Sequence, residues 1–111
     1  MPVHESIYEH LKAAAREGKF VTYGEIAPLA NLNMANETDR IKMTKLLQEI
    51  GDFELQHNRP MLPALVVQKS TKMPGQGFFR SARQSGIYKG GDDAGFFQEE
   101  LRKVYDYWKQ A

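Results

Sequence analysis

Apolar side chains recur at spacings of three and four residues in three stretches of this chain, and no other feature constrains its fold as strongly. The pattern predicts amphipathic helices over residues 4–17, 36–50 and 93–110. The stripe of the last helix is the clearest and consists of Phe97, Leu101, Val104 and Trp108. Each such helix has one face to bury, so the core is expected where these faces meet.

A shorter helix is predicted over residues 23–30. Thr22 and Glu25 have the spacing of a capping box, in which the Thr22 hydroxyl accepts a hydrogen bond from a free amide and Glu25 reaches back. Pro28 lies inside this helix, which is therefore expected to be short or bent. Together with the helix over 36–50, it resembles a helix-turn-helix arrangement.

Two strands are predicted in the middle of the chain. Residues 53–56 alternate between apolar and polar side chains, which is typical of a half-buried strand. Residues 62–68 begin with a continuous apolar run that indicates a buried strand, and Pro63 restricts its first part to an edge or an entry position. Residues 70–77 are expected to form a loop, followed by a short helix from Phe78.

Length and composition narrow the class of protein. A chain of 111 residues is long enough for one domain. Cysteine is absent, which excludes disulfide bonds, thiolate metal sites and cysteine nucleophiles. No apolar run approaches the roughly 18 residues that span a membrane, and the first residues lack the basic start and apolar run of a secretory signal. We therefore expect a cytoplasmic protein with one domain over residues 1–111 and no membrane partner.

Positive charge is concentrated in one segment. Residues 1–54 contain six Lys or Arg and nine Asp or Glu, whereas residues 92–111 contain three and five. Residues 55–91 contain no acidic residue and six basic ones: Arg59, Lys69, Lys72, Arg80, Arg83 and Lys89. A segment of this kind gathers phosphates by releasing their counterions. The alternative is a solvated face that the acidic flanks balance in space.

The sequence contains no recognised motif for catalysis or metal binding. Its three histidines have no metal-ligand spacing, and no serine stands in a Gly-x-Ser-x-Gly frame. An enzyme would need a titratable group with a shifted pKa in a pocket, for which His57 and Glu54 are the candidates. We therefore expect no cofactor, no metal and no enzymatic activity.

Several uncharged side chains in the basic segment suit nucleic acid. Amide side chains can read the edges of bases, and five of them lie here: Gln56, Asn58, Gln68, Gln76 and Gln84. Phe78 or Phe79 would stack on a base if exposed, although at least one of the two is expected in the core. Gly75 and Gly77 allow a tight turn, whose backbone amides could also face an anion.

The stretch from residue 18 to residue 30 reads Gly-Lys-Phe-Val-Thr-Tyr-Gly-Glu-Ile-Ala-Pro-Leu-Ala. It resembles the entry to the DNA-binding helix-turn-helix of the O6-alkylguanine-DNA alkyltransferases and the alkyltransferase-like proteins. Residues 59–67, Arg-Pro-Met-Leu-Pro-Ala-Leu-Val-Val, and residues 74–79, Pro-Gly-Gln-Gly-Phe-Phe, are similar to that family's Pro-Cys-His-Arg-Val strand and its Gly-rich successor. The resemblance implies a winged-helix DNA site, in which Tyr23 sits against the DNA backbone near an extruded base.

The chain departs from this family at the reactive residues. Where the family has Cys-His-Arg, residues 64–66 are Ala-Leu-Val, so the alkyl acceptor and its histidine relay are missing. Arg40 is the nearest candidate for the family's intercalating arginine, at a longer spacing from Tyr23. The resemblance thus implies a fold and DNA contact without repair chemistry. Residues 62–79 also resemble small bacterial and phage proteins of unknown activity.

Together these observations predict an α+β fold, a single winged-helix-like domain in which helices and a small antiparallel sheet are closed by a C-terminal helix. The first functional hypothesis is a non-catalytic nucleic-acid-binding module with DNA as its partner. The residues expected to bind nucleic acid are Tyr23, Arg40, Lys42, Lys45, Arg59, Lys69, Lys72, Gln76, Arg80 and Arg83. The second hypothesis is a protein-interaction module on the same fold, in which a partner or a second copy protects an apolar patch.

Overall fold

The computed structural model describes residues 3–110, and about two thirds of them are helical. Five α-helices follow one another along this part of the chain: α1 (Glu5–Arg16), α2 (Tyr23–Ile26), α3 (Glu37–Gln56), α4 (Gln76–Ser85) and α5 (Asp93–Gln110). The other elements are two 3-10 helices, η1 (Ala27–Ala30) and η2 (Leu62–Leu65), and two short strands, β1 (Val21–Thr22) and β2 (Val66–Val67). Helices therefore supply most of the core.

The two strands form a parallel pair, in which Val21 lies opposite Val66 and Thr22 lies opposite Val67. Parallel neighbours need a long connection, and here it contains α2, η1, α3 and η2. Both strands of the sheet in the described residues therefore run in the same direction. The predicted α+β fold, a winged-helix-like domain with a small antiparallel sheet, is wrong.

Residues 53–56 are the last turn of α3 and not a strand, so the predicted helix end at residue 50 is wrong as well. Gly51 is buried where α3 passes close to Met61, and a Cβ there would lie 3.2 Å from Met61 Cε. This glycine permits a close contact and does not end the helix. The strand prediction placed the apolar Phe53 and Leu55 on the buried face. In the structure the fully buried residue of this turn is instead the charged Glu54.

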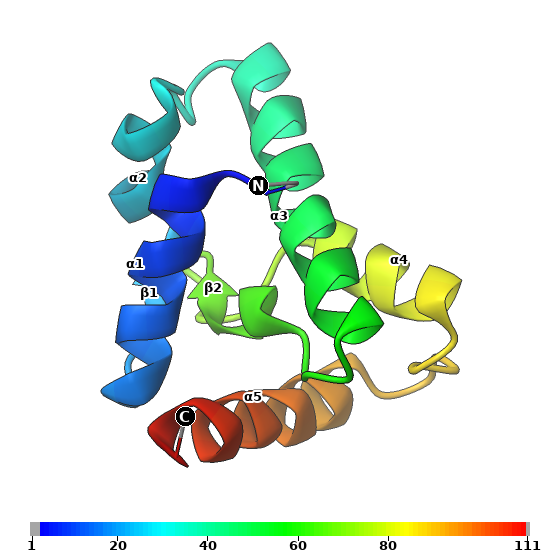
Figure 1. Ribbon diagram of the computed structural model, residues 1–111. Coiled ribbons are helices and arrows are strands. Elements are labelled where there is room, and N and C mark those ends of the chain that lie inside the picture. Colours follow the sequence, from blue (N-terminus) through cyan, green and yellow to red (C-terminus); the bar gives the residue numbers. More distant parts are fainter. Residues whose placement is uncertain (1–2, 111) are drawn as a thin grey trace.

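Residues 62–67 are buried as predicted, but most of them do not form the predicted strand. Leu62–Leu65 forms η2, and only Val66–Val67 is extended. All six of these residues are buried. Figure 1 shows the segment in the middle of the molecule, where α1, α3 and α5 pack against η2. The apolar run thus forms the centre of the core in a mainly helical protein.

The helices predicted at the two ends of the chain are confirmed. α1 begins after His4, whose Nδ1 accepts a hydrogen bond from the Ile7 amide at 3.3 Å. α5 begins after Asp92, whose carboxylate accepts a hydrogen bond from the Gly95 amide at 2.9 Å. The two helices pack against each other. No helix in residues 3–110 has both the length and the apolar character that crossing a bilayer requires.

The short helix is also confirmed, in two parts. α2 begins at Tyr23, and Thr22 Oγ1 accepts a hydrogen bond from the Glu25 amide at 3.2 Å. The chain then tightens into η1, with Pro28 in its first turn, as the predicted bend requires. Glu25 does not reach back to the start of the helix, because its carboxylate lies 2.9 Å from His10 Nε2. That half of the predicted capping box is wrong.

A buried ionic cluster joins α1 to the end of α3. The Tyr8 hydroxyl donates to Glu54 Oε1 at 2.7 Å, and Arg59 Nε and Nη2 donate to the same oxygen at 3.1 and 3.0 Å. Burial raises the pKa of Tyr8, and the hydrogen bond to Glu54 raises it further. The carboxylate therefore has both a charged partner and a neutral donor inside the protein, as a buried charge requires.

Candidate functional site

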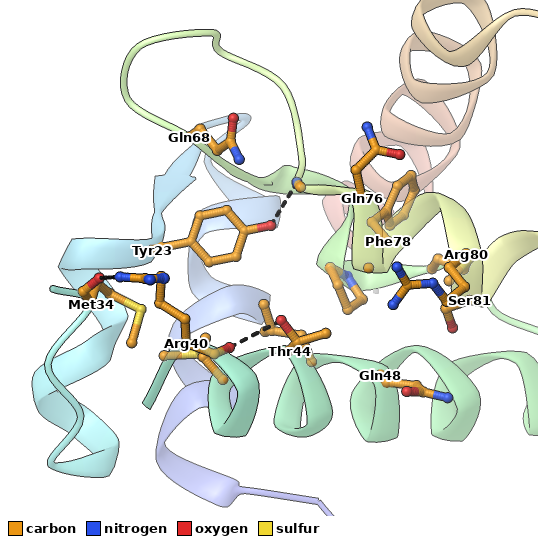
Figure 2. Close-up of a pocket in the computed structure, with 16 residues that line it drawn as sticks. Tyr23, Met34, Arg40, Thr44, Gln48, Gln68, Gln76, Phe78, Arg80 and Ser81 are labelled. Carbon is orange, nitrogen blue, oxygen red and sulfur yellow. Dashed lines mark hydrogen bonds between the residues drawn. The ribbon is translucent and has the colours of Figure 1, made fainter. Parts of the chain in front are cut away.

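A pocket opens between α3 and α4, with Tyr23 at one end. Its cavity measures about 350 Å³, within the range of pockets that hold small ligands. Figure 2 shows side chains converging on it from parts of the chain that lie far apart in the sequence. They come mainly from α2, α3, η2 and the stretch that leads from Gln68 into α4.

The body of the pocket is apolar and rich in methionine. α3 contributes Met43 and Leu47, which share a face because they are four residues apart. Pro63 and Met61 line the pocket from η2 and the residue before it, and Met34 lines it from the loop before α3. Three of the five methionines of the chain thus line one pocket. Thioether side chains are flexible and polarisable, so such walls adapt to a flat apolar ligand.

α4 forms the facing wall because Gly77 lets it approach α3 closely. A Cβ at Gly77 would lie 2.6 Å from Thr44 Cγ2, which is too short for two carbon atoms. The Thr44 hydroxyl points to its own helix, where it donates to the Arg40 carbonyl oxygen at 3.1 Å. This contact places Phe78 and Arg80 of α4 at the pocket.

Tyr23 is held at the pocket by Gly75, a residue that lies far from it in the sequence. Its hydroxyl accepts a hydrogen bond from the Gly75 amide at 2.8 Å. Burial raises the pKa of Tyr23, and the hydrogen bond from Gly75 offsets part of that rise. The hydroxyl is therefore protonated at neutral pH, and no acceptor for its proton is found among residues 3–110. Tyr23 has a donor available for a ligand.

Two arginines flank the pocket from opposite sides. Arg40, in the first turns of α3, donates from Nη1 to the Met34 carbonyl oxygen at 2.9 Å. Arg80 projects from α4 and is exposed. Neither forms an ion pair with a carboxylate in the described part of the chain. Both positive charges are therefore available to an anionic ligand.

Exposed amide side chains surround the rim of the pocket. Gln48 comes from α3, Gln76 begins α4, and Gln68 follows β2. The Gln68 oxygen accepts a hydrogen bond from the Thr71 hydroxyl at 3.1 Å, which fixes its orientation. Each amide offers donors and an acceptor, so the rim can bind groups that carry both.

Four of the residues predicted to bind nucleic acid line this pocket together: Tyr23, Arg40, Gln76 and Arg80. Lys42 and Lys45 do not line it. The pocket face of α3 consists of residues 40, 43, 44, 47 and 48, and the helical repeat places Lys42 and Lys45 on a different side of the helix.

Two of the predicted phosphate contacts lie beside carboxylates. Arg59 is mostly buried and binds Glu54 in the ionic cluster. Arg83 lies 3.8 Å from Asp93, between the end of α4 and the start of α5. The basic segment therefore does not form one continuous patch, and neither of these two residues lines the pocket.

Lys69 and Lys72 lie in the loop between Gln68 and Gly75, both of which line the pocket. The two lysines are exposed, and no carboxylate of residues 3–110 pairs with them. Two backbone hydrogen bonds hold the loop. The backbone amide of Gln68 donates to the Met73 carbonyl oxygen at 2.8 Å, and the backbone amide of Lys72 donates to the backbone carbonyl oxygen of Gln68 at 2.9 Å. These lysines extend the positive charge of the rim.

Phe78 and Phe79 are both buried, with 8% and 2% of their surfaces exposed. Phe78 lines the pocket, whereas Phe79 packs in the core beside Tyr88. Phe79 is therefore not available for stacking on a base. Gly75 precedes α4 and Gly77 lies in its first turn, so the predicted turn is the start of a helix.

Several lining residues were not predicted from the sequence. Met34, Met43 and Met61 lie too far apart in the chain for any periodicity to connect them. Ser81 follows Gly77 by four residues, so it shares the pocket face of α4. That spacing would have indicated Ser81 if the start of α4 had been predicted correctly.

The candidates for enzyme chemistry lie outside the pocket. His57 Nδ1 lies 2.8 Å from the Phe53 carbonyl oxygen at the end of α3, and Glu54 is bound in the ionic cluster. Within residues 3–110, no group of three or more His, Cys, Asp or Glu side chains could hold a metal ion. The pocket therefore offers apolar contact, positive charge and hydrogen bonds to a ligand.

Comparisons with known proteins do not assign the chain to a family. No family model matches it, and neither the curated proteins nor the solved structures include a significant match. The resemblance to the alkyltransferases stays a prediction.

Proposed function

We propose that this chain is a non-catalytic nucleic-acid-binding module with DNA as its partner. The observation that carries the proposal is the placement of Arg40 and Arg80 on either side of an apolar pocket that Tyr23 closes at one end. Arginines bind phosphates through a planar fork of donors, and a base is a flat group that fits an apolar pocket. One nucleotide combines both requirements.

In this proposal the backbone of the nucleic acid runs along the rim. Arg40 and Arg80 contact phosphates on the two sides of the pocket, and Lys69 and Lys72 add charge from the neighbouring loop. The Tyr23 hydroxyl, whose proton has no acceptor in the described residues, donates a hydrogen bond to a phosphate oxygen at the edge of the pocket. Such contacts provide affinity and position but do not read the sequence.

The pocket itself takes one base that has left the stack. Extruded bases are held between apolar surfaces and are bound at their polar edges. The methionine walls supply the surfaces, and Gln48 and Gln76 supply polar groups at the rim. The resemblance of residues 18–30 to the alkyltransferases supports this assignment, because it implies an extruded base near Tyr23. Ala64 stands where that family has its acceptor cysteine, so the module binds without accepting an alkyl group.

A protein-interaction module has less support. Its docking surface would be an apolar patch, for which the large exposed apolar side chains of the described residues are Phe20, Leu29, Ile41, Ile87 and Tyr107. The free arginines at the pocket also have no part in such a surface. A cytoplasmic location forms part of the proposal, since nucleic acid is present there.

A salt series tests the proposal, with a labelled DNA duplex and single strand followed by fluorescence anisotropy. The logarithm of the affinity is expected to fall linearly with the logarithm of the salt concentration, because bound phosphates release counterions. Changing Arg40→Gln and Arg80→Gln together is expected to weaken binding about tenfold or more at low salt. The slope should fall by roughly 0.7–0.9 for each phosphate that the variant no longer binds.

The matched control changes Lys42→Gln and Lys45→Gln, which removes the same charge from another side of α3. This pair is expected to keep most of the affinity and the slope of the unchanged protein. Two outcomes contradict the proposal. One is the absence of DNA binding at low salt, and the other is an equal loss of affinity in the lysine pair and the arginine pair.

A further inference from the structure

One buried polar atom at the pocket has no partner. Three buried side-chain atoms in residues 3–110 lack a hydrogen bond: Glu54 Oε2, Ser81 Oγ and Trp108 Nε1. Of these three residues, only Ser81 lines the pocket. Proteins keep few buried polar groups unpaired, because each one forgoes the hydrogen bonds that it had with water. An unpaired hydroxyl in the wall of a pocket therefore points to a contact that a ligand completes.

The helix that carries Ser81 does not satisfy its hydroxyl. Only 4% of Ser81 is exposed, so water does not satisfy it either. Helical serines and threonines commonly donate to a carbonyl oxygen of their own helix. Thr44 and Ser85 do so here, to the carbonyl oxygens of Arg40 and Ala82 at 3.1 and 2.9 Å. Ser81 makes no such bond among the described residues.

Apolar side chains form most of the pocket wall near Ser81. Figure 2 shows Ser81 beside Arg80 on the α4 wall, with Gln48 on the facing helix α3. The walls formed by Met43, Leu47 and other apolar side chains offer no hydrogen bond. Ser81 Oγ is itself buried, so a ligand that reaches past the rim meets this polar group only as the flexible methionine walls adapt to it.

We propose that Ser81 is a specificity-determining residue of this pocket, whose hydroxyl hydrogen-bonds to a polar edge atom of the bound base. The inference rests on the proposed function, because a base must first enter the pocket. A hydroxyl both donates and accepts, so it can bind a ring nitrogen, a carbonyl oxygen or an amino group. A flat hydrocarbon of the same shape leaves the hydroxyl unpaired and binds less tightly.

The test uses single strands in which every nucleotide is an abasic tetrahydrofuran unit except the central one. That position carries one of the four natural bases, a nonpolar isostere such as difluorotoluene, or no base, while the number of phosphates stays constant. The unchanged protein is expected to bind its preferred natural base about fivefold more tightly than the isostere, as one hydrogen bond provides. Ser81→Ala is expected to reduce this ratio to less than about twofold. Its affinity for the isostere and the fully abasic strand should not change.

The matched control is Ser85→Ala, which removes a hydroxyl from the same helix at a residue outside the pocket lining and should keep the full ratio. Urea unfolding of each variant checks that the fold is intact. If Ser81→Ala keeps the preference for the natural base, Ser81 does not determine specificity. If the unchanged protein prefers a base to the abasic strand but does not distinguish the isostere, this inference fails while the proposed function stands. Equal binding of all strands refutes the occupation of the pocket by a base.

Discussion

Tyr8 and Tyr23 are both fixed through their hydroxyl groups, but in opposite ways. Tyr8 donates its proton to the buried carboxylate of Glu54, so the hydroxyl is committed to the core. The oxygen of Tyr23 accepts a hydrogen bond from Gly75, and its proton remains available. Burial raises the pKa of both residues. One tyrosine therefore contributes to the stability of the fold, and the other presents an oriented donor to the pocket.

The free energy of unfolding is expected to fall as the pH rises above about 10, the ordinary pKa of tyrosine. In that range the unfolded chain releases the tyrosine protons, whereas the folded chain keeps them because both pKa values are raised. The folded state then binds more protons than the unfolded state, so a higher pH favours unfolding. Urea midpoints measured between about pH 8 and about pH 11 check this.

Tyr8→Phe is expected to flatten that pH dependence, since it removes the tyrosine whose pKa is raised by both burial and a buried carboxylate. Tyr107→Phe is the matched control, because Tyr107 is 39% exposed. It should show the alkaline loss of stability in full. Equal profiles for the two variants would show that the buried hydroxyl of Tyr8 does not produce the effect.

Among the elements, those with a complete apolar stripe could be predicted from the sequence alone. α1 and α5 each carry such a stripe, because the residues that decide their burial lie within the helix itself. The end of α3 could not be predicted in this way. Gly51 stays helical where it packs against Met61, and Glu54 is buried because Tyr8 and Arg59 bind it. Those partners belong to other elements, and no local pattern connects them.

The candidate site shows the same division. Tyr23, Arg40 and Arg80 could be predicted, because charge and an amino-acid motif are visible along the chain. The methionine walls and Ser81 could not, since they become neighbours only when α4 packs on α3. Lys42 and Lys45 have the same charge as the arginines. They do not line the pocket because they lie on a different face of α3.

Gly77→Ala tests the contact between α3 and α4. The new Cβ would lie 2.6 Å from Thr44 Cγ2, so either the Thr44 side chain or α4 must shift. The free energy of unfolding is expected to fall by about 1–3 kcal/mol, measured by urea unfolding. In an uncrowded helix the same substitution stabilises by roughly 0.5–1 kcal/mol, so the sign of the change is diagnostic.

Thr44→Ser provides the rescue, because it removes the Cγ2 atom and keeps the hydroxyl that bonds to the Arg40 carbonyl oxygen. The double variant with Gly77→Ala is expected to recover most of the lost stability. A Gly77→Ala protein as stable as the unchanged one, or a double variant without recovery, would show that this contact does not set the distance between the helices.

Across the described molecule, a basic residue paired in the interior contrasts with a group of unpaired basic residues beside the pocket. Arg59 is bound to a carboxylate in the interior, where it supports the junction of α1, α3 and α5. Arg40, Arg80, Lys69 and Lys72 lie at or beside the pocket without carboxylate partners in residues 3–110. A net charge of only +1 therefore coexists with a local excess of positive charge.

Arg59→Gln tests this contrast experimentally. The substitution leaves the carboxylate of Glu54 without its charged partner, so the free energy of unfolding is expected to fall by about 3 kcal/mol. The salt dependence of DNA binding, measured under conditions in which the variant is folded, should not change. Lys89→Gln, an exposed position, is the control and should alter stability by less than about 0.5 kcal/mol. A reduced salt slope in the Arg59 variant would instead make Arg59 a phosphate contact.

The parallel pairing of β1 with β2 implies an order of events during translation. Val21 leaves the ribosome well before Val66, its neighbour in the sheet. Met43 and Leu47 also remain uncovered until α4 has been synthesised. A nascent chain that ends before residue 81 thus exposes the apolar wall of an unfinished cavity, which favours aggregation and capture by chaperones. Premature termination there therefore yields a substrate for quality control.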